Sequence, residues 1–133
     1  HVDNVACFSN SNTILTMTCN DKSDSYYDLL SENLEILRSS TDQDGNPINI
    51  IELEMSKKRL IPNDDEPSSY INFYISNNAI IVPIFGDEPA DENAKKILNS
   101  QFQNRQIVCL DGRDILLGGG NIHCITQQQP RSL

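Results

Sequence analysis

The chain has 133 residues, enough for one domain that buries roughly two thirds of its unfolded surface. Its 38% hydrophobic content without tryptophan predicts an aliphatic core, and its formal net charge of −9 disfavours partners such as nucleic acid or an anionic membrane surface. No apolar run approaches the roughly 20 residues that a membrane-spanning helix needs.

The first part of the chain alternates short apolar runs with turn residues. We predict strands over 4–9 and 13–18 around a turn at 9–12, because both runs are apolar and the turn reads SNSN. A helix is expected over 25–38 and a third strand over 48–54. Ser25 is the expected N-cap of this helix. Its inward side chains should be Tyr26, Leu29, Leu30, Leu34 and Leu37.

The same order of elements returns after a long polar loop over 55–69. Strands are predicted over 70–75 and 79–84, a helix over 91–102 and a closing strand over 106–110. Asp91 is the expected cap of this second helix. Its inward residues should be Ala94, Ile97, Leu98 and Phe102.

The two parts align with each other as a repeat. Ile14 and Ile80 take equivalent places in the second strand of each part, and Ile50 and Ile107 do so in the last strand. The chain therefore contains two ββαβ modules, at about 4–54 and 70–110, and residues 121–129 should form a further strand. Two modules and one strand leave sheet edges and an apolar face uncovered, which predicts further modules of the same protein as partners.

Residues 116–130, LLGGGNIHCITQQQP, are the segment most typical of a reaction centre. Three glycines allow positive φ and a close approach of the backbone to a ligand, and Cys124 follows them. If 121–129 is extended, His123 points away from the face of Cys124. His1 and Asp3 would share a face of an extended start of the chain. Cysteine, histidine and carboxylate together suit nucleophilic chemistry at an electrophilic carbon.

Simpler interpretations of these residues compete with the catalytic one. A cysteine in a strand is most often a small buried hydrophobic residue, so Cys124 could be part of the core. A terminal histidine such as His1 is often left from a purification tag. His123 fits a structural hydrogen-bonding role.

The number and spacing of the cysteines also indicate whether a metal site is expected and in which cellular compartment the protein lies. Four cysteines without a CxxC pair, and only two histidines, disfavour a metal site. Three of the cysteines lie in apolar runs, which predicts reduced thiols in a cytoplasmic protein. The cysteines are Cys7, Cys19, Cys109 and Cys124.

Three segments resemble a known family. GRDILLGGGNIHCITQQQP (112–130) is similar to the C-terminal signature of the agmatine deiminases, which belong with the Porphyromonas-type peptidylarginine deiminases. HVDNVACF (1–8) resembles that family's Gly-His-Val-Asp-Asn segment, and residues 66–87 resemble the stretch between the two. The resemblance runs over nearly the whole chain and makes a tag origin of His1 a weak explanation.

The resemblance implies an α/β propeller of the pentein type, built of five ββαβ modules around a central active site. This chain would be the C-terminal part of that single catalytic domain. By resemblance, Cys124 corresponds to the nucleophile, His1 to the general acid–base and Asp3 to a carboxylate that holds the guanidinium group. The family needs no metal or organic cofactor, and it draws further acids from its N-terminal part, so the chain alone could be inactive.

The function implied is hydrolysis of agmatine to N-carbamoylputrescine and ammonia, a step of putrescine and polyamine biosynthesis, through an amidino-cysteine intermediate. The resemblance also implies a cytoplasmic homo-oligomer. Alternatives are a deiminase of arginine or peptidylarginine, an amidinotransferase of the same superfamily, and a non-catalytic binding module. A papain-like cysteine hydrolase is disfavoured because no helix is expected to start at Cys124.

Overall fold

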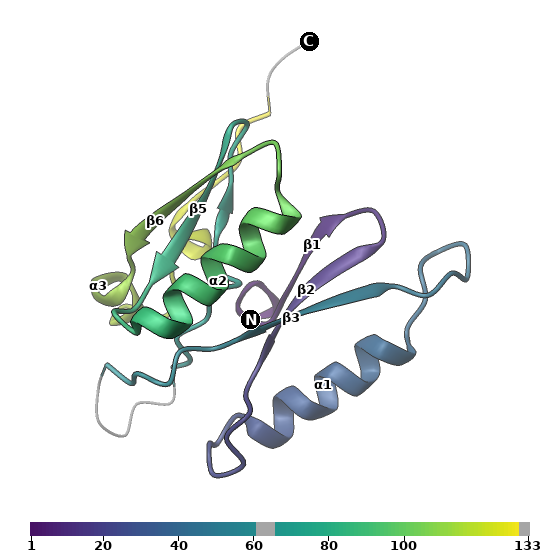
Figure 1. Ribbon diagram of the computed structural model, residues 1–133, viewed down its shortest axis with the longest axis horizontal. Helices are drawn as coiled ribbons and strands as arrows, with labels where there is room; N and C mark the ends of the chain where they lie inside the picture. The colour runs from purple at the N-terminus through teal and green to yellow at the C-terminus, as the bar shows by residue number, and fades with distance from the viewer. Residues whose placement is uncertain (61–65, 131–133) are drawn as a thin grey trace.

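A computed structural model describes residues 1–60 and 66–130, and it folds them as two ββαβ modules (Figure 1). Each module holds a three-stranded sheet in which the middle strand pairs antiparallel with the first strand and parallel with the last. The first module contains β1 (Ala6–Asn10), β2 (Thr13–Thr18), α1 (Tyr27–Ser39) and β3 (Asn49–Glu54). The second contains β4 (Tyr74–Ile75), β5 (Ala79–Ile84), α2 (Glu88–Gln101) and β6 (Gln106–Asp111).

Strand register confirms the internal repeat. Ile14 pairs with Ile50 across β2 and β3, and Ile80 pairs with Ile107 across β5 and β6. These four residues are the ones that the sequence repeat aligns. The predicted α/β fold class, with two ββαβ modules, is therefore confirmed.

The two modules share one core. Apolar side chains of β2 and β3 lie in the same cluster as those of β5 and α2. Helix α2 contacts both β6 of its own module and β3 of the other, so it joins the two sheets (Figure 1). Edge-to-face aromatic pairs complete the core of the second module, Tyr70 with Phe85 at 5.3 Å and Phe73 with Phe102 at 5.7 Å between ring centroids.

Both long helices differ from prediction at their starts. Asp24, and not Ser25, accepts the hydrogen bond from the backbone N–H of Tyr26, at 2.9 Å from Oδ1 to N. Asp91 is buried within the first turns of α2, where its Oδ1 accepts hydrogen bonds from the Tyr70 hydroxyl at 2.7 Å and from Phe85 N at 3.0 Å. The expected caps were wrong, because the N-cap residues are Tyr26 in α1 and Asp87 in α2. The Asp91 carboxylate is occupied by two donors from outside the helix, which the spacing of residues within the helix does not reveal.

The inward face of α2 is close to prediction, whereas that of α1 is not. In α2, Ala94 and Leu98 are buried and Phe102 follows as a buried C-cap. In α1 only Leu30 is buried, and Leu29 keeps 52% of its surface exposed. The α1 face that holds Leu29 is therefore not covered by these two modules.

Three predicted extended segments are not strands. Residues 70–73 form a buried loop, and pairing starts only at β4. The start of the chain is a 3-10 turn, η1 (Val2–Asn4), rather than an extended run. The strand expected over 121–129 was also wrong, because a short helix α3 (Arg113–Leu116) and the glycines lead into a second 3-10 turn, η2 (His123–Ile125).

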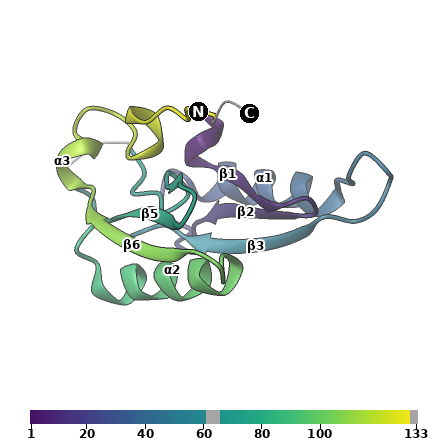
Figure 2. The same cartoon turned by 90° about the horizontal axis from the view of Figure 1, so that it is seen from above.

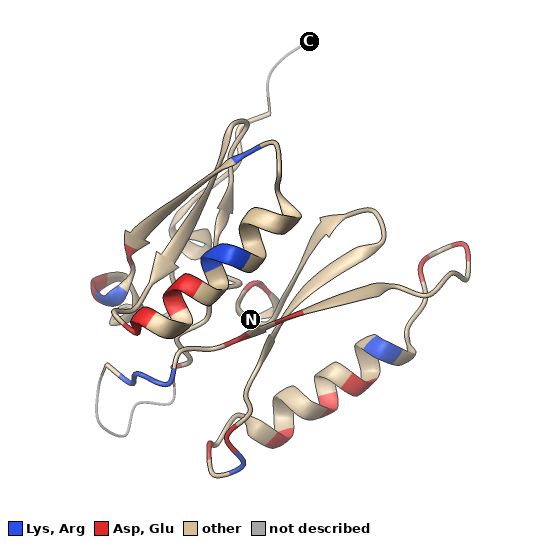
Figure 3. Cartoon of the chain, viewed as in Figure 1, with Lys and Arg blue, Asp and Glu red and all other residues tan. Residues whose placement is uncertain are grey.

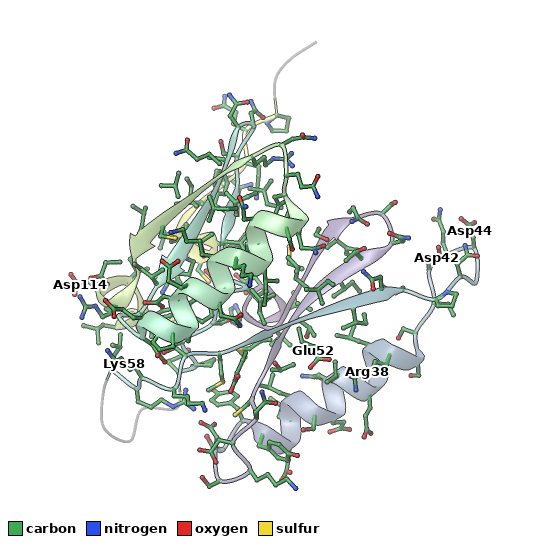
Figure 4. All side chains as sticks on the ribbon, in the orientation of Figure 1. Arg38, Asp42, Asp44, Glu52, Lys58 and Asp114 are labelled. Atoms are coloured by element: carbon green, nitrogen blue, oxygen red, sulfur yellow. The ribbon has the colours of Figure 1, made fainter. Side chains whose placement is uncertain are left out.

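The two 3-10 turns lie on one side of the molecule, opposite α2 (Figure 2). Acidic residues are spread along both long helices and several loops (Figure 3). Arg38 of α1 and Glu52 of β3 point toward each other at the outer surface, with 2.5 Å between Nη2 and Oε1, and Asp42 and Asp44 lie at the far loop (Figure 4). In the part of the chain that the structure describes, no helix is long and apolar enough to cross a membrane.

Candidate active site

Cys124 lies in the η2 turn, and its side chain is exposed. The interpretation of Cys124 as a buried core residue is therefore wrong. Gly120 makes room for the thiol: its φ is +86°, and a Cβ atom placed on it would lie 2.5 Å from Cys124 Sγ. Glycine is required here by both the backbone conformation and the space that the sulfur occupies.

Asp3 connects Cys124 to His123. Its Oδ2 is 3.1 Å from Cys124 Sγ and 3.0 Å from His123 Nδ1. In the 3-10 turn at 123–125, successive side chains are about 120° apart and not on opposite faces, so His123 does not point directly away from Cys124 as an extended strand would require. The prediction that His123 is remote from the site was wrong for that reason.

The ionisation of Asp3 follows from its neighbours. Burial raises the pKa of this carboxyl, but hydrogen bonds from Cys124 and His123, together with the charge of His123, outweigh burial and lower the pKa below its usual value. Asp3 is thus an anion at neutral pH. A carboxylate held beside a thiol suits the recognition of a cationic group at the sulfur.

A pocket of about 670 Å³ opens in front of these residues. Its lining includes the polar residues His1, Asp3, His123 and Cys124. It also includes apolar side chains, namely Val5, Met17, Leu29 and Leu30. The structure thus brings all three predicted site residues to one pocket, with Asp3 in direct contact with Cys124. His1 is exposed there, and its carbonyl accepts a hydrogen bond from Asn4 N at 3.2 Å.

Asn72 lies behind the site and was missed by the sequence analysis. Its side chain is fully buried and hydrogen-bonds to Asn4, His123 and Cys124. The sequence carried one signal, a polar residue inside the apolar run YINFYI, which burial inside a strand does not explain.

The other cysteines differ from Cys124. Burial raises the pKa of the Cys7, Cys19 and Cys109 thiols. Their thiols are therefore poor nucleophiles, which leaves Cys124 as the candidate. Among the residues that the structure describes, no group of three or more His, Cys, Asp or Glu side chains could hold a metal ion.

The sequence model of one family, described as Porphyromonas-type peptidyl-arginine deiminase, matches residues 1–130. The chain belongs to this deiminase family. Agmatine deiminase of Medicago truncatula is 37% identical over 98% of this chain and 40% of its own length. The chain therefore spans about 40% of the length of the curated relatives that it matches.

Solved structures of deiminases superpose on this chain over nearly its whole length. Agmatine deiminase of Enterococcus faecalis, described as catalyzing its reaction, superposes with a TM-score of 0.87 at 30% identity, over 98% of this chain and 40% of that one. A cysteine-to-serine variant of C. jejuni agmatine deiminase with substrate bound superposes with a TM-score of 0.81 at 32% identity, over 92% of this chain and 35% of that one.

Proposed function

We propose that the protein to which this chain belongs hydrolyses the guanidinium group of agmatine to N-carbamoylputrescine and ammonia. The observation that carries the proposal is the Asp3 carboxylate, which contacts the Cys124 thiol at the wall of a pocket. A planar guanidinium ion pairs with a carboxylate, so Asp3 would hold its carbon within reach of Cys124 Sγ. The agmatine deiminases among the relatives support agmatine as the substrate.

In the proposed reaction, Cys124 Sγ reacts as a thiolate. It forms a bond to the guanidinium carbon, and a C=N electron pair moves onto nitrogen. His1 then protonates the departing nitrogen, and the C–N bond breaks. Ammonia departs, and an amidino-thioether remains on Cys124. His1 takes a proton from water, and the oxygen adds to the same carbon. The C–S bond then breaks with its electron pair returning to sulfur, and loss of the remaining hydroxyl proton to solvent forms the C=O group of N-carbamoylputrescine. No metal or organic cofactor takes part in these steps.

Each residue has a place in that scheme that agrees with its position. Asp3 binds the substrate cation, and His1, which lines the same pocket, transfers protons. His123 pairs with Asp3 through Nδ1, so its role is to orient the carboxylate. The acids that the family draws from its N-terminal part would complete the site, and upstream modules, a homo-oligomer, a cytoplasmic location and a role in putrescine biosynthesis remain predictions.

The test is release of ammonia and N-carbamoylputrescine from agmatine by the complete polypeptide, beside its Cys124→Ser and Cys109→Ser variants. We expect turnover with the wild type and with Cys109→Ser, and loss of turnover with Cys124→Ser. Full turnover by Cys124→Ser would overturn the mechanism.

Parallel assays separate the related functions. Free arginine and an N-acylated arginine amide test the arginine and peptidylarginine alternatives, and an amine acceptor without ammonia release tests amidinotransfer. An intact Cys124 thiol with no turnover on any of these substrates would favour a binding module.

A further inference from the structure

The Asn72 side chain joins three distant parts of the chain. It is 0% exposed and lies in the buried loop before β4. It hydrogen-bonds to the η1 turn on one side and to the η2 turn on the other. A fully buried primary amide is costly unless both of its ends find partners.

The orientation of this amide is fixed by its surroundings. Oδ1 accepts hydrogen bonds from His123 N at 2.9 Å and from Cys124 N at 3.3 Å. Backbone N–H groups can only donate, so the oxygen must face them. The amide nitrogen therefore faces the other way, toward Asn4 Oδ1 at 2.8 Å and Cys124 Sγ at 3.1 Å. Two oxygens of Asp3, Oδ2 and the backbone carbonyl, lie farther from it, each at 3.3 Å.

The hydrogen bond from the Asn72 amide to Cys124 Sγ matters most once the thiol loses its proton. In the neutral site, the Cys124 S–H group donates to Asp3 Oδ2 at 3.1 Å. A thiolate cannot donate, and its charge is repelled by the Asp3 carboxylate until a cation lies between them. The Asn72 N–H bond to sulfur, in contrast, persists and becomes charge-assisted.

We propose that Asn72 is the positioning residue of this site: its amide N–H donates to Cys124 Sγ and stabilises the thiolate, while its carbonyl fixes the backbone that carries the sulfur. The proposal deepens the proposed function, because it rests on Cys124 as the nucleophile. Asn72 is fully buried, so it acts on the sulfur from behind and leaves the substrate side of the pocket to Asp3 and His1.

The test compares Asn72→Ala with Asn72→Asp in the complete polypeptide. Iodoacetamide reacts with the thiolate, whose sulfur forms the S–C bond as iodide leaves, and peptide mass analysis reports the rate at Cys124 alone. Asn72→Asp keeps the acceptor for the two backbone N–H groups but replaces the donor with a negative oxygen. Asn72→Ala removes both.

We expect the alkylation profile to move to higher pH in both variants and further in Asn72→Asp. At neutral pH the rate should fall roughly tenfold to a hundredfold, the worth of a hydrogen bond to a charged group. kcat should fall more than KM rises, because the Asn72 side chain is fully buried and does not line the pocket.

Ser69→Ala is the matched control. Ser69 is also buried in this segment, and its Oγ donates to Asn4 O at 2.6 Å and accepts from Ile71 N at 3.2 Å. The Ser69→Ala variant should lose stability, as measured by thermal unfolding, and keep the wild-type pH profile of Cys124 alkylation.

Two outcomes would overturn the proposal. A wild-type profile in Asn72→Asp would show that the donor is not needed, and a shifted profile in Ser69→Ala would assign the effect to packing. Failure of the proposed function looks different: the wild type would then release no ammonia from agmatine, or Cys124→Ser would keep its turnover, whatever the Asn72 variants do in the alkylation assay.

Discussion

Asp3 and Cys124 are 121 positions apart in the sequence, yet Asp3 Oδ2 lies 3.1 Å from Cys124 Sγ. One carboxylate oxygen thus touches the thiol and, at 3.0 Å, the Nδ1 of His123. A substrate cation that enters the pocket meets an anion already held at the nucleophile. The charge of Asp3 is therefore the feature of the site most open to experiment.

Replacing Asp3 with Asn should remove this charge and keep the shape of the side chain. We expect turnover of agmatine to fall at least about thirtyfold, since loss of one partner of a desolvated ion pair costs about 2 kcal/mol or more. Asp111→Asn is the control, because Asp111 pairs with Arg113 at the exposed surface. Equal activities of the two variants would contradict a substrate-binding role for Asp3.

Substitution of His1 and substitution of His123 should lower kcat by different factors. His1→Gln should lower kcat about a hundredfold, since it removes the group proposed to transfer protons. His123→Gln should cost about tenfold or less, because His123 acts through its hydrogen bond to Asp3. A larger loss of kcat in His123→Gln than in His1→Gln, measured in steady-state assays, would assign proton transfer to His123.

Gly120→Ala should displace the thiol. The new Cβ would lie 2.5 Å from Cys124 Sγ, and a shift of about 1 Å at a reacting atom can cost about a hundredfold in rate. Gly119→Ala shares the backbone penalty, with φ of +82°, but its Cβ would have no described atom within 4 Å. Both should lose roughly 1 kcal/mol of stability. Alkylation of Cys124 should slow in Gly120→Ala alone, and equal slowing in both would contradict the steric explanation.

Tyr70 should make the fold sensitive to alkali. Burial and the neighbouring Asp91 raise the pKa of its hydroxyl well above the usual value of 10.0. A raised folded-state pKa gives stability that is fully present below pH 10 and declines as pH rises above it, because only the unfolded chain then releases the proton. Chemical denaturation at pH 8 and at about pH 11 should show this decline in the wild type and a smaller one in Tyr70→Phe. A Tyr70→Phe decline as steep as that of the wild type would assign the effect to other groups.

Much of the fold could be predicted because its signals are local. Ile14, Ile50, Ile80 and Ile107 mark equivalent places in two runs of apolar residues, and the register of both sheets follows from them. Residues 70–73 were misassigned because a buried loop and a buried strand share the same apolar composition. Burial alone does not say whether Tyr70 or Phe73 has a strand partner.

The site was predicted less well, because its arrangement depends on turns. Residue type and resemblance predicted Cys124, Asp3 and His1 as site residues, and all three line one pocket. An assumed period of two then placed His123 on the wrong face, since the glycines before it lead into a 3-10 turn. Asn72 was missed because only tertiary contacts distinguish it from the other amides of the chain.

The position of Asn72 between the η1 and η2 turns also has a kinetic consequence. Each ββαβ module can form from contacts that are close in sequence, whereas the pocket requires residues 1–4 and 119–124 to meet, and Asp3 and Cys124 are 121 positions apart. Closing so long a loop comes after the local contacts have formed. A chain that has built both sheets but has not yet brought the η1 and η2 turns together would hold an unactivated thiol. Cys124 would then gain its reactivity only as the last part of the fold closes.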